Sequence, residues 1–302
     1  MKALVTGASS GIGKEISKYL IELGYDLYVV SNDEKIKELY NNSKTTVMPI
    51  VLDLTSEDNC YKLYEKLKKE NIDVVINNAG FGLAGNFTET SLENELKMID
   101  LNIKAYHILT KLFLKDFVMR DKGRLLNVAS MAGFMPGPYM DTYYATKAYV
   151  LNLSLGIYEE LKRSNSNVKI SIFCPGPVKT NFENVANVKF NIREINANYA
   201  AKYAIDNMFK NKLIIIPPNM KLNKILVKMV PIKTLLYINS FIQEKNSWTY
   251  VKFLDTFFWK MLLTGFKFIP ISFWQAEIFL LIYSRLSDYY FQKMKITIIK
   301  LH

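Results

Sequence analysis

A glycine-rich segment directly after the first apolar run most constrains what this chain can fold into. The run Lys2–Val5 suits a short buried strand, and the helical pattern KEISKYLIEL begins at Lys14. Between them, TGASSGIG allows a tight turn that brings backbone N–H groups close to a phosphate at the positive end of the helix. Glycine strings alone are common, so the strand before and the helix after strengthen the prediction of a phosphate-binding turn. The turn residues that this prediction uses are Gly7, Gly11 and Gly13, with Ser9 and Ser10 as hydroxyl donors.

Short apolar runs alternate with amphipathic stretches through the first two thirds of the chain. This alternation predicts repeated β-α units and a doubly wound parallel sheet covered by helices, with ligands at the carboxyl ends of the strands. Pro217 and Pro218 can neither donate to a sheet nor continue a helix. They mark a predicted boundary between a nucleotide-binding α/β domain, 1–218, and a C-terminal helical extension, 219–302. The predicted strands are Lys2–Val5, Asp26–Val30, Val47–Leu52, Asp73–Asn77, Gly123–Ala129, Lys169–Cys174 and Leu213–Ile216.

The net charge of +11 and the two cysteines limit the classes of partner. Residues 219–302 contain 12 Lys and Arg against 4 Asp and Glu, a balance of +8, which leaves 27 against 24, or +3, for residues 1–218. The basic residues are mixed with bulky apolar ones and no nucleic-acid-binding module is visible, so nucleic acid is not an expected partner. Cys60 and Cys174 are too few for a disulfide framework or a Cys-rich metal site, and the first ten residues lack a secretory apolar segment. We therefore expect a cytoplasmic protein without a metal.

A serine, a tyrosine and a lysine in the stretch NVASMAGFMPGPYMDTYYATKAYVLNLS form a candidate acid–base site. Tyr143 and Lys147 share one face of a helix, so the ammonium is expected to favour the phenolate and lower the phenol pKa from about 10. Such a phenol can donate a proton to a carbonyl oxygen or take it back. Ser130, near a strand end, can hydrogen-bond the same oxygen. Tyr144 also meets Lys147 on a helix, so spacing alone does not choose between the two tyrosines.

The glycine turn and the Tyr–Lys pair together resemble the short-chain dehydrogenase/reductase family, whose patterns are T-G-x-x-x-G-x-G and Y-x-x-x-K. The resemblance covers residues 1–218 and implies a Rossmann fold. It assigns the proton transfer to Tyr143, places Ser130 at the family's catalytic serine, and leaves Tyr144 to pack or line the site. It implies that Lys147 also hydrogen-bonds the nicotinamide ribose. Asn102, in DLNIKAYHI, matches the asparagine that bends its helix and holds a water in the proton path to Lys147.

The same resemblance implies an NAD(P) cofactor. The segment NNAG at 77–80 matches one that supports the sheet and passes close to the cofactor, and Asp53 matches the acidic residue that contacts the adenine ring. The segment Pro175–Thr180 matches the one that grips the nicotinamide carboxamide. The cofactor-binding residues implied are Gly7, Ser9, Ser10, Gly11, Ile12, Gly13, Asn32, Asp53, Leu54, Asn78, Ala79, Gly80, Tyr143, Lys147, Pro175, Gly176, Val178 and Thr180.

The end of the second predicted strand bears on the choice between NAD and NADP. A carboxylate there binds the ribose 2′-hydroxyl, whereas a cation accepts a 2′-phosphate. Ser31 and Asn32 offer neutral donors, Asp33 comes one or two positions late, and Lys35 is near. The segment favours NADP, and so reduction in the cell, with NAD left open.

The extension has its own composition. Lys221, Lys224 and Lys228 recur at helical spacing beside apolar residues, and all three tryptophans lie beyond them. Three roles stay open: a helical cap over the substrate pocket or a dimer surface, peripheral attachment to a membrane, and a transmembrane anchor. The longest apolar span, Phe268–Ser284, contains a proline and a glutamate and is shorter than the roughly 20 residues of a crossing helix, which argues against an anchor.

These features predict an oxidoreductase that moves a hydride between NAD(P)(H) and a ketone or secondary alcohol on an apolar substrate. The resemblance also implies a homodimer or homotetramer packed through the helices around Asn102 and Tyr143. The alternative is a nucleotide-binding regulatory or scaffold protein on the same fold, against which the set Asn102, Ser130, Tyr143 and Lys147 argues. The substrate itself is not indicated, because the region after Thr180 shapes that pocket.

Overall fold

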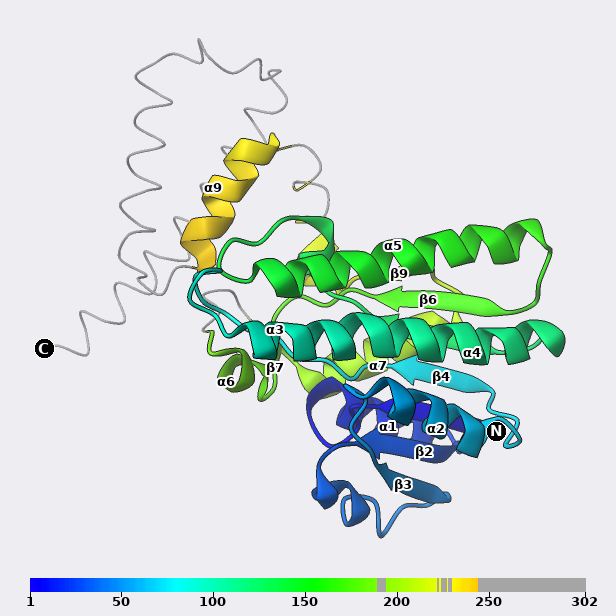
Figure 1. Cartoon of the computed structure of the whole chain (residues 1–302). Helices are drawn as coiled ribbons and strands as arrows, with labels where there is room; N and C mark the ends of the chain where they lie inside the picture. Colours follow the sequence, from blue (N-terminus) through cyan, green and yellow to red (C-terminus); the bar gives the residue numbers. More distant parts are fainter. Residues whose placement is uncertain (189–193, 222, 224–226, 228–229, 244–302) are drawn as a thin grey trace, which may run out of the picture. The chain divides into compact units, whose positions relative to one another are not determined.

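The computed structural model of the chain describes residues 1–243, apart from 189–193, 222, 224–226 and 228–229 (Figure 1). The chain forms two compact units, Met1–Lys245 and Asn246–His302, and all described residues belong to the first. This unit includes helix α9 (Ile232–Gln243), which the sequence analysis grouped with the extension. The boundary predicted after residue 218 stays a prediction.

A parallel sheet of seven strands forms the centre of the first unit, in the order β3-β2-β1-β4-β5-β6-β9. Successive strands extend in one direction from β1 and then in the other from β4, and ligands of open sheets bind where this reversal occurs. The predicted doubly wound Rossmann sheet is confirmed, with both ends of every predicted strand within one residue of the observed bounds. The strands are β1 (Lys2–Thr6), β2 (Asp26–Ser31), β3 (Val47–Val51), β4 (Val74–Asn77), β5 (Arg124–Val128), β6 (Lys169–Phe173) and β9 (Ile214–Ile215).

Helices cover both faces of the sheet, because alternate strand side chains point to opposite sides. Ala3 and Val5 of β1 pack with apolar residues of α1 and α7, whereas Leu4 packs with those of α2 and α4. The α-helices are α1 (Gly11–Glu22), α2 (Glu57–Leu67), α3 (Leu92–Ile99), α4 (Tyr106–Met119), α5 (Asp141–Arg163), α6 (Phe182–Ala186), α7 (Ala197–Phe209) and α9. A π-helical turn spans Asp100–Ala105, and short 3-10 helices span Glu34–Lys37, Met131–Phe134 and Pro218–Met220.

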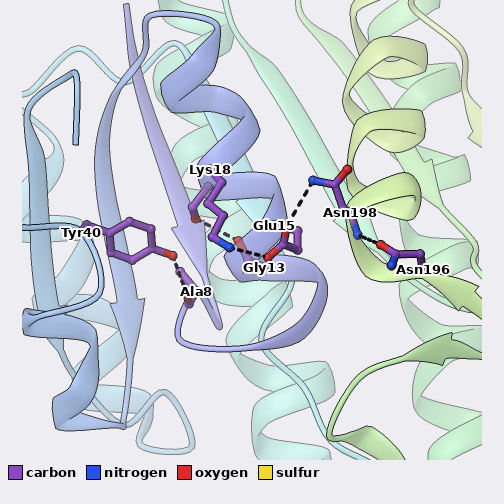
Figure 2. Close-up of polar contacts among 8 residues, drawn as sticks. Ala8, Gly13, Glu15, Lys18, Tyr40, Asn196 and Asn198 are labelled. Atoms are coloured by element: carbon purple, nitrogen blue, oxygen red, sulfur yellow. Dashed lines mark hydrogen bonds and ion pairs between the residues drawn. The ribbon is translucent and has the colours of Figure 1, made fainter. Parts of the chain in front are cut away.

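A second, two-stranded sheet pairs β7 (Val178–Lys179) with β8 (Ile195–Asn196). The sequence carries no signal for it, because a two-residue strand has no readable alternation. Figure 2 shows how the start of α7 is fixed next to it: the Asn196 Oδ1 accepts from the Asn198 backbone N–H at 2.8 Å, and the Asn198 Nδ2 donates to Glu15 of α1 at 3.2 Å. The segment that follows Pro177 is thereby tied to the helix that carries the glycine turn.

Helix α9 is attached to the loop that precedes α5. The Asn239 Nδ2 donates to the Pro136 carbonyl at 2.8 Å, and Leu235 and Asn239 are buried. Within the described ranges, no helix is long and apolar enough to cross a membrane. Of the predicted basic segment, Lys224 and Lys228 lie outside the described residues, as do the three tryptophans and Phe268–Ser284.

Candidate active site

A cleft of about 710 Å³ opens at the carboxyl ends of the central strands. The glycine turn after β1 lines one part of it, and residues of α5, α6 and α9 line another. Of the residues predicted to bind the cofactor or to act in catalysis, all except Gly13 and Asn102 line this cleft. The fold therefore brings together residues that are up to 173 positions apart in the sequence, from Gly7 to Thr180.

Three glycines shape the turn that follows β1. Gly7 and Gly11 have φ values of +67° and +54°, which L side chains rarely adopt. A Cβ on Gly13 would lie 2.2 Å from the Gly7 carbonyl oxygen, so Gly13 acts by leaving room behind the cleft and not by lining it. The side chain of Ser10, the N-cap of α1, makes no capping hydrogen bond, which leaves the first-turn N–H groups for an anion. This cradle fits the pyrophosphate of a dinucleotide.

Two side chains from other elements hold the turn in place. The Tyr40 hydroxyl donates to the Ala8 carbonyl at 2.6 Å (Figure 2). The Asn78 Nδ2, just after β4, donates to the carbonyls of Thr6 and Gly7 at 3.0 and 3.2 Å. The asparagine predicted to pass close to the cofactor thus also fixes the glycine turn. Its neighbour Asn77 faces the core, where its Nδ2 donates to Thr110 and to Asn127.

Ser130, Tyr143 and Lys147 line the same cleft. Ser130 follows β5, and its Oγ accepts from the Ala132 N–H at 3.1 Å. Tyr143 and Lys147 lie in the first two turns of α5, with the Lys147 Nζ 5.8 Å from the centre of the Tyr143 ring. The same Nζ donates to the Val128 carbonyl at 3.0 Å. The phenol and the ammonium therefore share one side of the helix at the end of β5, as their spacing predicts.

Burial shifts the acid–base properties of this pair. It raises the pKa of the Tyr143 phenol to about 12, against the opposing effect of a hydrogen bond with Ser130. It lowers the pKa of the Lys147 ammonium to about 8. The expectation that Lys147 lowers the phenol pKa below its ordinary value is therefore wrong: desolvation of the phenolate outweighs the hydrogen bond with Ser130.

Asn102 lies behind the cleft, fully buried in the π-helical turn between α3 and α4. Its Oδ1 accepts from the Phe81 N–H at 3.2 Å, and its Nδ2 donates to the Phe81 carbonyl at 2.9 Å and to the Thr146 hydroxyl at 3.1 Å. Gly80 lies against it: a Cβ there would be 2.8 Å from the Asn102 Oδ1 and 3.5 Å from the Lys147 Nζ. Asn102 thus joins the NNAG segment to the helix that carries the Tyr–Lys pair.

Two residues with neutral side chains, Ser31 and Asn32, line the cleft at the end of β2. The Ser31 hydroxyl donates to the Ser9 hydroxyl at 2.8 Å and accepts from the Asp33 N–H at 3.1 Å. Asn32 is exposed at the cleft wall. The Asp33 carboxylate instead caps its own short helix by accepting from the Lys35 N–H at 3.0 Å. Neither Asp33 nor Lys35 is among the described residues that line the cleft.

Several cleft residues were not singled out by the sequence analysis. Phe182 of α6 lies 5.3 Å from Tyr143, ring centre to ring centre, and Met140 is buried in the same apolar cluster. Gln243 of α9 reaches the cleft from the far end of the described chain. Single apolar or amide side chains carry no spacing signal, and only the region after Thr180 was expected to shape the pocket. Tyr144 lines the cleft, which was one of its two predicted roles.

Comparison with known proteins decides the family. A protein-family profile described as short chain dehydrogenase matches residues 1–189, which is more than half of the chain. The chain belongs to the short-chain dehydrogenase/reductase family. As a member it is an NAD(P)-dependent oxidoreductase that acts on CH–OH or C=O groups.

Relatives and solved structures agree with this assignment. An uncharacterised oxidoreductase of Staphylococcus saprophyticus is 32% identical over 185 residues, which are 59% of this chain and 78% of the relative. A short-chain dehydrogenase from Sphingobium yanoikuyae in complex with NADPH superposes with a TM-score of 0.68 at 27% identity, over 76% of this chain and 93% of the other. A bulky-bulky ketone specific alcohol dehydrogenase from Comamonas testosteroni gives a TM-score of 0.64 at 26% identity, over 76% and 94%.

Proposed function

We propose that this enzyme reduces ketones on apolar substrates with NADPH and uses Tyr143 as the proton donor. The observation that supports this most is the convergence of Tyr143, Ser130 and Lys147 in one cleft with the glycine turn. A bound nicotinamide supplies the hydride to the carbonyl carbon. The phenol of Tyr143 gives its proton to the carbonyl oxygen, and the Ser130 hydroxyl hydrogen-bonds that oxygen and polarises the carbonyl.

Lys147 and Asn102 support the phenol of Tyr143. In our proposal the Lys147 ammonium hydrogen-bonds the nicotinamide ribose and stabilises the phenolate left after proton transfer. Asn102 positions the helix and belongs to the path by which the proton is replaced. Its three hydrogen bonds to Phe81 and Thr146 support such a positioning role.

The apolar nature of the substrate is supported by the cleft wall around Tyr143. Met140, Phe182 and Val185 line it, and the ring of Phe182 lies close to that of Tyr143. The Comamonas relative is named for bulky ketones, which supports a similar class of substrate here. A bulky apolar ketone would remove the side chains of Phe182 and Val185 from water on binding.

At the end of β2, none of the described residues that line the cleft carries a carboxylate. This supports the preference for NADPH. Ser31 and Asn32 lie there, and the Asp33 carboxylate is occupied in capping. The Sphingobium neighbour is a complex with NADPH. The ratio of kcat/KM for NADPH to that for NADH tests the preference, and a ratio below one contradicts it.

The decisive experiment compares the wild type with Tyr143→Phe and Tyr149→Phe on a panel of ketones, following NADPH absorbance. Loss of a general acid costs on the order of 10²- to 10⁴-fold in rate, so Tyr143→Phe is expected to lose turnover and keep NADPH binding. Tyr149 lies on the same helix outside the cleft, and its hydroxyl pairs with His107, so its variant keeps turnover. Substantial activity of Tyr143→Phe would overturn the assignment.

We also propose that the enzyme is a cytoplasmic homodimer or homotetramer packed through α4 and α5, with the part of 219–302 that follows Lys245 in contact with a membrane surface. Exposed apolar side chains of α4, Val118 and Met119, support the first part. The balance of +8 in residues 219–302 supports the second. Light scattering at several protein concentrations tests the oligomer, and a monomer at all of them contradicts it.

A further inference from the structure

A polar pair lies in the apolar part of the cleft. The Nε2 of Gln243, the last residue of α9, donates to the phenol oxygen of Tyr144 on α5. Both residues line the cleft. The Tyr144 ring meets that of Tyr143 edge to face, with the centres 6.1 Å apart. The pair therefore lies next to the proton donor of the proposed reaction.

This pair has unused hydrogen-bonding capacity. Within the described residues, the Gln243 Oε1 is buried and has no hydrogen-bond partner. Buried amide oxygens are almost always paired in proteins, because an unpaired one has lost its water without compensation. The Tyr144 hydroxyl accepts from Gln243 and keeps its own proton to donate. The pair thus combines an unpaired acceptor with a free donor.

Both side chains are held in place from behind. The Tyr144 ring packs on Gly137, where a Cβ would lie 2.4 Å from it. The Asn239 Nδ2, one turn before Gln243 on α9, donates to the Pro136 carbonyl at 2.8 Å. Because Pro136 and Gly137 belong to the same loop, α9 and the Tyr144 ring are fixed against one support. The pair is therefore already oriented before a ligand binds, which reduces the cost of ordering it.

The surroundings of the pair favour a neutral ligand group. Among the described residues that line the cleft, the charged side chains are Asp53, Lys97 and Lys147. Lys97 forms an ion pair with Glu93 at 2.7 Å, and Lys147 donates to the Val128 carbonyl. A substrate carboxylate at Gln243 would be buried without a cation among these residues and would face the Oε1, which is unfavourable.

We propose that Gln243 and Tyr144 form a subsite for a neutral hydroxyl group, so that the preferred substrates are hydroxylated ketones. The inference rests on the proposed ketone reduction. A hydroxyl donates to the Gln243 Oε1 and accepts from the Tyr144 O–H, which pairs both groups. A methyl group in the same position leaves both unpaired, and a site built to hydrogen-bond a hydroxyl discriminates strongly against an analogue without it.

The test uses 4-phenylbutan-2-ones that carry a hydroxyl, a methyl or a carboxylate at the meta or para ring position. Wild type is expected to prefer the hydroxyl over the methyl compound in kcat/KM by on the order of 10- to 100-fold at one of the two positions, and to reduce the carboxylate least.

Gln243→Met keeps the length of the side chain and removes the carboxamide, so the preference is expected to disappear. Tyr144→Phe should reduce it. Asn239→Ala weakens the attachment of α9 without touching the carboxamide, so it should affect hydroxyl and methyl compounds by similar factors.

Two results overturn the subsite: no preference for the hydroxyl in wild type at either ring position, or a preference that survives in Gln243→Met. An equal loss of kcat/KM on both compounds in Gln243→Met counts as the second result, because the preference then survives and the loss is structural. If wild type reduces none of the ketones, the proposed function fails. The subsite is then judged by calorimetric binding of the hydroxyl and methyl compounds to Tyr143→Phe loaded with NADP⁺, with and without Gln243→Met.

Discussion

Burial moves the two proton-carrying side chains of the cleft in opposite directions. It raises the pKa of Tyr143 to about 12 and lowers that of Lys147 to about 8, in both cases because the charged form loses hydration. The phenol is therefore a neutral acid throughout the working pH range. The ammonium is the partner whose charge changes near neutral pH.

The first prediction concerns the pH dependence of cofactor capture. The kcat/KM for NADPH reports ionisations of the free enzyme. The proposed contact with the nicotinamide ribose needs the Lys147 side chain in its ammonium form. We expect kcat/KM for NADPH to fall as the pH rises above about 8, the lowered pKa of Lys147. A stopped-flow or steady-state profile from pH 6 to 10 measures this. A profile that stays flat beyond pH 9 would contradict the role of Lys147.

The same shift has a consequence for stability with a definite sign. Between pH 8 and the ordinary pKa of 10.5, the unfolded chain binds more protons at Lys147 than the folded chain does. The contribution of Lys147 to the free energy of unfolding therefore rises with pH across this window, and burial of the ammonium opposes folding below it. Deprotonation of Lys147 above pH 8 is therefore expected to lower activity. It also removes the free-energy cost of burying the charged side chain.

At the scale of elements, the π-helical turn between α3 and α4 connects the cofactor side of the cleft to the catalytic helix. The turn places the Asn102 side chain between Phe81 and Thr146. Such turns interrupt a helix at a defined position, often at functional sites. Here the interruption links the NNAG segment after β4 to α5, so Gly80 and Lys147 keep a fixed separation.

Replacement of Asn102 by alanine should therefore damage both stability and turnover. The change removes three hydrogen bonds and leaves the N–H and C=O of the partly buried Phe81 without their partners, so we expect a loss of about 2–3 kcal/mol in the free energy of unfolding. Urea denaturation measures it. Asn152→Ala is the matched control, because this exposed residue makes one local bond on α5, and its effect should stay within about 0.5 kcal/mol. Equal effects of the two variants would contradict the positioning role.

Two glycine-to-alanine changes in helices should have opposite effects. In Gly13→Ala the added Cβ would lie 2.2 Å from the Gly7 carbonyl oxygen, so the helix must move, at a cost of about 1–3 kcal/mol, and NADPH binding should weaken. In Gly156→Ala the Cβ meets nothing within 4 Å in an exposed part of α5, so stability should rise by about 0.5–1 kcal/mol. Melting temperatures and NADPH fluorescence titrations compare them. Unimpaired NADPH binding by Gly13→Ala would argue against the proposed cradle.

At the scale of the whole molecule, one compact unit holds all of the described residues that line the cleft. Met1–Lys245 contains the sheet, the glycine turn, the Tyr–Lys pair and α9. The remaining residues, 246–302, contain 7 Lys and Arg against 3 Asp and Glu, a balance of +4, and all three tryptophans. Cofactor binding and surface attachment are therefore expected to be separable functions of the two units.

A vesicle assay tests that separation. The full chain is expected to sediment with anionic vesicles at low salt and to be released at high salt, because basic residues near such a surface each contribute roughly 1 kcal/mol that salt screens. A chain ending after Lys245 should stay in the supernatant and still bind NADPH. Phosphatidylcholine vesicles serve as the neutral control. If the full chain stays in the supernatant at every salt concentration, the proposed membrane contact is wrong.

The sequence by itself determined the sheet and the main chemical set of this protein. Each strand is a contiguous apolar run such as Val47–Leu52, and the glycine turn and the Tyr143–Lys147 pair are local patterns, so all of them can be read without tertiary contacts. The family resemblance then supplied Asn102, which carries no local signal of its own, and matched Ser130 to the family's catalytic serine.

Only the tertiary structure decided how deeply the side chains of the cleft are buried and which residues of distant elements they contact. The burial of a side chain sets the free-energy cost of ionising it, and the sequence does not show how deeply a side chain is buried. For this reason the predicted direction of the Tyr143 pKa shift was wrong. The approach of Gln243 to Tyr144 across 99 positions likewise depends on how α9 packs on the Pro136 loop. Spacing along the chain fixes which face of one element a residue occupies, whereas contacts between distant elements exist only once those elements have packed.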